Sequence, residues 1–210
     1  MLIRRDRGDT LIEVIVAFGV FSLVTVGSLT LMNQGASLSQ RTLELGLVRQ
    51  AVNSQAETLR FLHDSYVTSY VPGEVFDPSA TNKGPAWQWQ NMTNSIQLAG
   101  ATSSTPLGGS ATSCPTPAAG RFIMDTQLGQ FVTPAATVYQ PATTYAQVDY
   151  SNGPKPYGIW IEAIRSATNG SDPYQSKLGY IDFHILACWP GPGSDIPMTL
   201  ATIVRLYEPR

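Results

Sequence analysis

The fold of this chain is decided by residues 7–32, which read RGDTLIEVIVAFGVFSLVTVGSLTLM. No charged residue occurs from Val14 to Gln40, a run of 27 positions. A membrane-spanning helix needs about 20 mostly apolar residues, so this stretch predicts a transmembrane helix over about residues 11–32. An ordinary secretory signal is a poorer match, because its apolar region covers only about 7–15 residues and ends at a small-residue cleavage site.

Basic residues precede the apolar run at Arg4, Arg5 and Arg7. Basic residues beside a transmembrane helix stay on the cytoplasmic side of the membrane. The pattern therefore predicts a single-pass protein of the cytoplasmic membrane, with its N-terminus inside and everything after the helix outside.

Glu13 interrupts the apolar stretch directly after Leu11 and Ile12. A charge at the membrane centre costs roughly 2.5–3.5 kcal/mol on insertion scales, and less near an end of the helix. One interpretation is a carboxylate that still reaches the lipid headgroups. The other is a carboxylate kept for a partner, because cleavage of the chain just before it would create an amino group that is positively charged below a pKa of about 8.

Residues 7–14, RGDTLIEV, resemble the prepilin cleavage and methylation motif of type IV pilins and of type II secretion pseudopilins. The resemblance implies a leader peptide at residues 1–8, cleavage after Gly8 by a prepilin peptidase, and N-methylation of Asp9 as the mature terminus. It also implies that Glu13, the fifth mature residue, neutralises the terminal amine of a neighbouring subunit during assembly. The first mature residue of the family is usually apolar. Asp9 departs from this pattern, and its carboxylate could pair with the new amine of its own chain.

In function, the resemblance implies a structural subunit of a type IV pilus or a related filament, assembled through its hydrophobic helix. Surface adhesion, motility or DNA uptake would be its roles. Its partners would be other pilin subunits, the prepilin peptidase, the assembly platform with its ATPase, and the cytoplasmic membrane, and the assembled protein would lie in an extracellular filament. Two alternatives stay open: a pseudopilin of a type II secretion system, and an adhesin or binding module displayed at a filament tip.

Helical periodicity continues beyond the apolar run. Apolar residues recur at intervals of three, four or seven, which marks one face of a helix. This face consists of Leu38, Leu45, Val48, Val52, Ala56, Leu59 and Leu62. No proline occurs before Pro72, so we expect one long helix over residues 9–65. Its second half should pack on a globular domain, in preference to forming a coiled-coil stalk.

The remaining residues, 66–210, predict a β-rich globular domain. Residues 71–120 contain turn-forming pairs such as Pro72-Gly73 and predict a loop region. Within it, Trp87-Gln88-Trp89 alternates, which is consistent with either a short strand or an aromatic anchor. Residues 122–124 and 131–132 are expected to supply a further strand.

Strand-like segments with turn residues between them fill the C-terminal third and predict an antiparallel meander. These segments are residues 157–165, 180–188 and 199–207. The sequence thus predicts an α+β protein, in which a long N-terminal helix, membrane-spanning in its first half, packs against a C-terminal antiparallel β-sheet. The resemblance further implies the ladle shape of pilins.

The chain contains two cysteines, Cys114 and Cys188. Two are too few for a disulfide framework or a four-cysteine zinc site. In an exported protein they would form one disulfide, which would close a loop of roughly 75 residues and contribute about 3–4 kcal/mol. The alternative is a pair of unpaired thiols.

Charge and motifs exclude several classes of function. The net charge is −2 and only 13% of the residues are charged, so the basic surface typical of nucleic-acid binding is absent from the composition. The sequence lacks the H-E-x-x-H, C-x-x-C, G-x-S-x-G and P-loop patterns. We interpret His63 and His184 as structural, and the sequence predicts no enzyme, no catalytic residue, no cofactor and no metal site.

Overall fold

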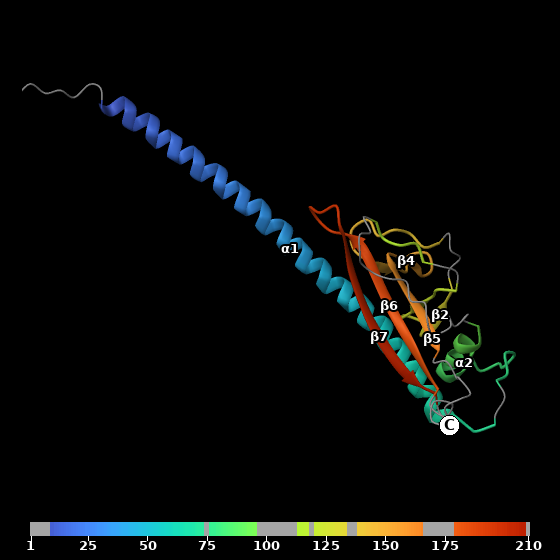
Figure 1. Cartoon of the computed structure of the whole chain (residues 1–210). Helices are drawn as coiled ribbons and strands as arrows, with labels where there is room; N and C mark the ends of the chain where they lie inside the picture. The colour runs from blue at the N-terminus through green and yellow to red at the C-terminus, as the bar shows by residue number, and fades with distance from the viewer. Residues whose placement is uncertain are drawn as a thin grey trace, which may run out of the picture. The chain divides into compact units, whose positions relative to one another are not determined.

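The computed structural model describes residues 9–73, 76–95, 113–117, 120–133, 138–165 and 179–208. The chain divides into two compact units, Met1–Leu43 and Glu44–Arg210. Helix α1 (Asp9–Ser69) begins in the first unit and ends in the second (Figure 1). The helix ends four residues beyond the predicted boundary at residue 65, and Gly8 with the rest of the predicted leader lies outside the described residues.

The first half of α1 is an apolar helix in which serine and threonine hydroxyl groups are hydrogen-bonded within the helix itself. Every side chain of residues 11–36 is exposed. Hydroxyl groups of this segment donate to carbonyl oxygens one turn earlier at 2.8–2.9 Å, in the pairs Ser22–Phe18, Thr25–Phe21, Ser28–Val24 and Thr30–Val26. Because these donors have partners in their own helix, the segment presents almost only apolar surface to its surroundings.

The second half of α1 buries one face, as predicted. The buried apolar residues are Val48, Val52, Ala56, Leu59 and Leu62, each at most 3% exposed. Leu45 is partly buried against the same core. Leu38 does not belong to this buried face, because 61% of it is exposed. The prediction placed it there because periodicity shows which residues share a face and not where a partner for that face ends.

The main sheet has the order β5–β6–β7, formed by β5 (Ile159–Arg165), β6 (Tyr180–Pro190) and β7 (Pro197–Tyr207). Both pairs are antiparallel, so the predicted meander is confirmed. Alternate residues of β6, namely Ile181, Phe183, Ile185 and Ala187, are fully buried on the face that packs against α1, which we call the inner face. Figure 1 shows the sheet lying along the second half of the helix.

Two smaller antiparallel sheets accompany the main one. The first pairs β1 (Ile123–Asp125) with β2 (Gln130–Val132), and the second pairs β3 (Gln147–Asp149) with β4 (Lys155–Tyr157). A bridge between Phe122 and Ile161 connects the first of these to β5. The residues expected to supply one strand thus form a hairpin, which turns through Gly129 at a φ of 63°.

Helix α2 (Pro85–Ser95) corrects the prediction of loop at residues 85–95 and the strand interpretation of Trp87-Gln88-Trp89. The rest of the predicted loop region has no helix or strand where it is described, and residues 74–75, 96–112 and 118–119 lie outside the described residues. Pro85 has the backbone angle of a first helical residue, and Gln88 N donates to Gly84 O at 3.0 Å to close the first turn. Three alternating residues are too few to distinguish a strand from a helix. The anchor interpretation is confirmed for Trp89, which is 2% exposed and joins α1 and the main sheet in one core.

Candidate functional site

The N-terminal half of α1 carries the residues that the motif singles out. Asp9 is the first residue of α1, and Glu13 lies four positions later and is exposed. Four helical residues correspond to about 6 Å along the axis. Among residues 11–40, Glu13 is the one charged side chain. The segment therefore holds a single carboxylate near the start of a long apolar helix.

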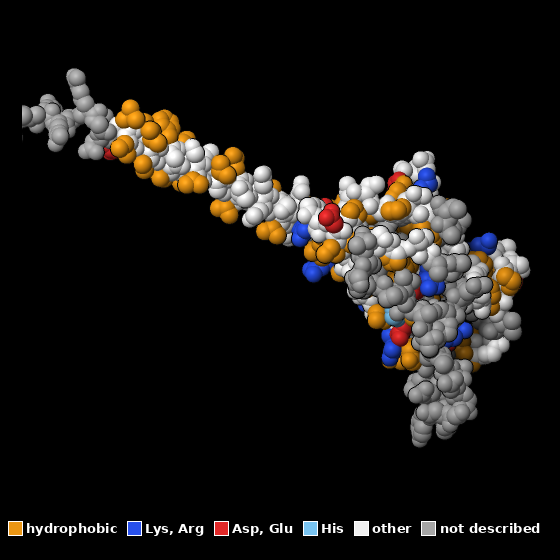
Figure 2. All heavy atoms as spheres, turned by 45° about the horizontal axis from the view of Figure 1, so that its top comes forward, with side chains coloured by type: hydrophobic (Ala, Val, Ile, Leu, Met, Phe, Trp, Pro, Cys, Tyr) orange, Lys and Arg blue, Asp and Glu red, His pale blue; other side chains and the backbone are white. Residues whose placement is uncertain are grey.

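Large apolar side chains precede and follow this carboxylate along the helix. They include Leu11, Ile12, Val16, Phe18, Phe21 and Leu23, which are 58–75% exposed. Figure 2 shows apolar side chains along the face of the segment in view. Among the described residues, α1 is the one helix long and apolar enough to cross a membrane. A contiguous apolar surface of this size marks contact with lipid or with other protein.

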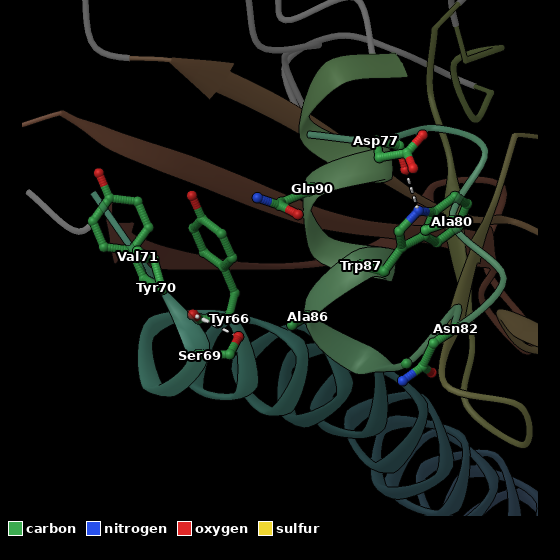
Figure 3. Close-up of a pocket in the computed structure, with 11 residues that line it drawn as sticks. Tyr66, Ser69, Tyr70, Val71, Asp77, Ala80, Asn82, Ala86, Trp87 and Gln90 are labelled. Carbon is green, nitrogen blue, oxygen red and sulfur yellow. Dashed lines mark hydrogen bonds between the residues drawn. The ribbon is translucent and has the colours of Figure 1, made fainter. Parts of the chain in front are cut away.

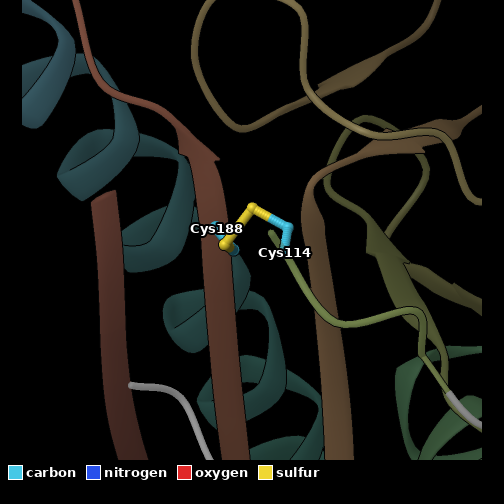
Figure 4. The surroundings of a disulfide bond; sticks show 2 residues. All are labelled: Cys114 and Cys188. Carbon is cyan, nitrogen blue, oxygen red and sulfur yellow. A yellow bond between two sulfur atoms is a disulfide. The ribbon is translucent and has the colours of Figure 1, made fainter. Parts of the chain in front are cut away.

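The predicted disulfide is confirmed between Cys114 and Cys188, with a Cα–Cα distance of 5.6 Å. Cys188 lies on β6 and Cys114 on residues 113–117 (Figure 4). Cys188 packs with Trp160 and Leu186 in a second, smaller core, against which Cys114 and Tyr139 are placed. These residues alternate with those of the inner face, so the disulfide holds residues 113–117 over the outer face of the sheet.

A buried ion pair on the outer face was missed by sequence reasoning. Arg121 Nε lies 2.8 Å from Glu162 Oε1, and the Glu162 side chain is completely buried. Trp160 Nε1 donates to the same carboxylate oxygen at 3.1 Å. A glutamate inside the apolar strand sequence of β5 is the available signal, because a charge in a buried strand needs a partner. The sequence does not indicate that the partner is Arg121.

Polar contacts fix the second half of α1 to the β-strands. Gln55 Nε2 donates to Met124 O at 2.9 Å, and Met124 N donates to Gln55 Oε1 at 2.7 Å. His63 Nε2 donates to Tyr207 O at 2.8 Å, since a carbonyl can only accept. Trp189 Nε1 donates to Glu44 Oε2 at 3.1 Å. These contacts set the helix in one position along the sheet.

The two histidines lie apart. His63 is packed edge-to-face on Trp89, with ring centroids 5.0 Å apart. His184 lies in β6, opposite Glu162 and Ile203 in the register of the sheet. Within the described ranges, no three His, Cys, Asp or Glu side chains gather in a group that could hold a metal ion.

Comparison of the chain with protein-family models, with curated proteins and with solved structures found no match.

Proposed function

We propose that the protein is a structural subunit of a type IV pilus or a related filament, cut after Gly8 and assembled through the first half of α1. The observation that carries the proposal is the combination of one carboxylate with a wholly exposed apolar surface. Glu13 lies four residues after the proposed new terminus Asp9, and every side chain of residues 11–36 is exposed.

The apolar surface of residues 11–36 would have to be shielded from water both before and after assembly. Lipid would cover it before assembly, in the cytoplasmic membrane. The helices of neighbouring subunits would cover it in the filament, where packing between helices replaces packing against lipid. A Cβ added at Gly19 or Gly27 would meet nothing within 4 Å in this chain, so a neighbouring helix has room for a close approach there.

The carboxylate of Glu13 would select the register between neighbouring subunits. Inside a bundle of apolar helices, an unpaired charge is unfavourable by several kcal/mol. The amine created at Asp9 of a neighbour would neutralise it if that neighbour were displaced by about 6 Å along the helix axis, since four residues separate the two groups. The carboxylate of Asp9 would compete for the same amine, which makes Asp9 the residue that sets how strongly Glu13 is needed.

The rest of the proposal concerns topology and partners. The prepilin peptidase would act on the cytoplasmic side, where the arginines of the leader would hold the N-terminus. An assembly platform with its ATPase would move the subunit out of the membrane. The unit Glu44–Arg210 would lie outside, and its Cys114–Cys188 disulfide fits an oxidising compartment.

Intact-mass analysis of filaments sheared from the cell surface tests the proposal. We expect a subunit that lacks residues 1–8 and carries one additional methyl group. A Gly8→Asp variant should keep its leader and stay in the membrane, whereas the matched Gly46→Asp variant, changed in the second half of α1, should be processed normally. Uncleaved protein confined to the membrane of the parent strain would contradict the proposal. Cleaved protein that is missing from surface filaments, together with a secretion defect on deletion of the gene, would assign the pseudopilin function instead.

A further inference from the structure

A cavity of about 280 Å³ opens between the end of α1, the loop that follows it and the start of α2. Figure 3 shows its side chains on both sides of Gln90. Its aromatic and polar lining includes Tyr66, Tyr70, Asp77, Asn82, Trp87 and Gln90. We call this space the aromatic cavity. Its described lining residues all belong to the unit Glu44–Arg210, and none lies in residues 11–36, through which we propose that the subunit assembles.

Trp87 is held in place although it is half-buried rather than part of the core. Its Nε1 donates to Asp77 O at 2.9 Å, and Phe76 lies against its ring with centroids 5.8 Å apart. Because the indole N–H already has a partner, Trp87 offers a ligand the part of its ring that lines the cavity and is not covered by Phe76 or Lys83. A platform fixed before binding loses little conformational entropy when a ligand arrives.

The two tyrosines of the lining contact each other, and Tyr66 also contacts the core. Tyr66 and Tyr70 meet edge-to-face with ring centroids 5.7 Å apart, and Tyr66 stacks on the buried Trp89 at 6.5 Å. Partial burial raises the pKa of the Tyr66 hydroxyl, while a hydrogen bond with Gln90 acts in the opposite direction. The phenol therefore stays neutral at physiological pH and serves as a hydrogen-bonding group.

Charge restricts the class of ligand. Among the described residues that line the aromatic cavity, Asp77 is the one that carries a charge. Hydrogen bonds from the side chain and backbone of Ser79 lower the pKa of its carboxyl group, so it is ionised at neutral pH and disfavours anions. Lys83 Nζ lies 5.3 Å from the centroid of the Trp87 ring, so a second cation at this ring would be repelled. A neutral, polar ligand satisfies both constraints.

We propose that the aromatic cavity binds a neutral saccharide of one or two pyranose rings. The C–H groups on a face of a pyranose fit the electron-rich faces of aromatic rings. Its hydroxyl groups both donate and accept, as do the amides of Asn82 and Gln90, and they can donate to the carboxylate of Asp77. The volume lies at the lower limit of about 300–1,000 Å³ for small-molecule sites, which suits a ligand of this size. This binding would add a recognition function to a filament subunit without depending on filament assembly.

Saturation-transfer NMR on the full chain in lipid nanodiscs tests the inference, because nanodiscs avoid detergents with sugar headgroups. The probes are maltose, cellobiose, lactose and N,N′-diacetylchitobiose, with tetramethylammonium and inorganic phosphate as charged comparisons. We expect saturable binding of at least one saccharide and none of either ion. The proposal would be overturned if none of the four saccharides bound. It would also be overturned if one of the ions bound and Trp87→Ala abolished that binding.

Variants locate the binding and separate it from assembly. Trp87→Ala should lower the affinity for the saccharide roughly tenfold, which corresponds to about 1.4 kcal/mol of binding free energy. Asn82→Ala changes an exposed side chain and should weaken binding about threefold without loss of folding, while Tyr207→Ala, an aromatic residue 55% exposed elsewhere, should have no effect. Both cavity variants should still enter filaments. Saccharide binding unchanged in Trp87→Ala and Asn82→Ala would overturn the assignment to this cavity.

Discussion

The two halves of α1 are the same kind of helix in two different surroundings. Residues 11–36 expose every side chain, whereas residues 44–69 bury Val48, Leu59 and Leu62 completely. Backbone geometry does not distinguish them, because both are continuous α-helix. The difference shows that the second half obtains its apolar partner from its own chain, while the apolar surface of the first half is left exposed by the described residues.

Polar contacts follow the same division. In the first half, hydroxyl groups such as those of Ser22 and Thr25 donate only to carbonyls of the preceding turn. In the second half, Gln55 and His63 bond to backbone atoms of Met124 and Tyr207, far away in the sequence. The hydroxyl groups of the first half therefore keep their hydrogen bonds whatever surrounds the helix. The second half is held in one position by hydrogen bonds to the β-strands.

The largest effect should come from Glu13→Ala, which tests the need of the first half for an outside partner. We expect filament incorporation to fall roughly tenfold or more, because the amine of a neighbouring subunit would lose its counter-charge in an apolar setting. The measurement is the amount of subunit in sheared filaments relative to the membrane fraction. Glu57→Ala, which removes a 70% exposed side-chain carboxylate from the second half, is the control and should incorporate normally. Equal incorporation of both variants would remove the assembly role of Glu13.

A second test compares the same substitution in both halves. Leu59→Ala should lower the free energy of unfolding of the unit Glu44–Arg210 by about 2–5 kcal/mol, because it creates a cavity at a fully buried position. Leu31→Ala, at a position 70% exposed, should leave that free energy unchanged within about 0.5 kcal/mol. All four tryptophans, at positions 87, 89, 160 and 189, lie in this unit, so denaturant unfolding followed by tryptophan fluorescence reports on it alone. Equal destabilisation by both substitutions would break the comparison.

Removal of the disulfide should act only on the second unit. The double variant Cys114→Ser, Cys188→Ser should lower its free energy of unfolding by about 2–4 kcal/mol, since the unfolded chain then gains the freedom of an open loop. Insertion of residues 11–36 into membranes should not change, and flotation of the protein with lipid vesicles measures this. An unchanged denaturation midpoint would show that residues 113–117 are held by packing alone.

The smallest expected effect is a change in how strongly acid destabilises the fold, and it involves Asp77 in the loop after α1. The folded pKa of Asp77 lies below its ordinary value of 3.8, because the Ser79 hydroxyl and backbone N–H donate to the carboxylate. A lowered folded pKa stabilises the fold above the unfolded pKa, and this contribution is lost as pH falls through the folded value. Thermal unfolding should therefore lose slightly more stability on acidification to about pH 2 in the parent than in Asp77→Asn. An identical acid response of the two proteins would show that the contact does not contribute.

Local patterns in the sequence were sufficient for the elements that repeat over many residues. Apolar residues spaced along one face predict α1, and alternation over whole strands predicts the β5–β6–β7 meander. With two cysteines in the chain, one pairing is available, and it is the one observed. These features depend on neighbours in the sequence or on a count, so they can be recognised without knowledge of the fold.

Tertiary structure decided the rest, because the contacts concerned join residues far apart in the chain. Trp87-Gln88-Trp89 could have formed a strand or a helix by its sequence. It lies in a helix, in which Trp89 is buried in the core that α1 shares with the main sheet. The pairing of Glu162 with Arg121 and the meeting of Tyr66 with Trp87 around one cavity also require the folded chain. The sequence by itself determined the apolar helix with its single carboxylate Glu13. Only the fold decided where along that helix burial begins: Leu38 is exposed and Val48 is buried, because a sheet formed from the C-terminal third of the chain covers the apolar face at Val48 and beyond.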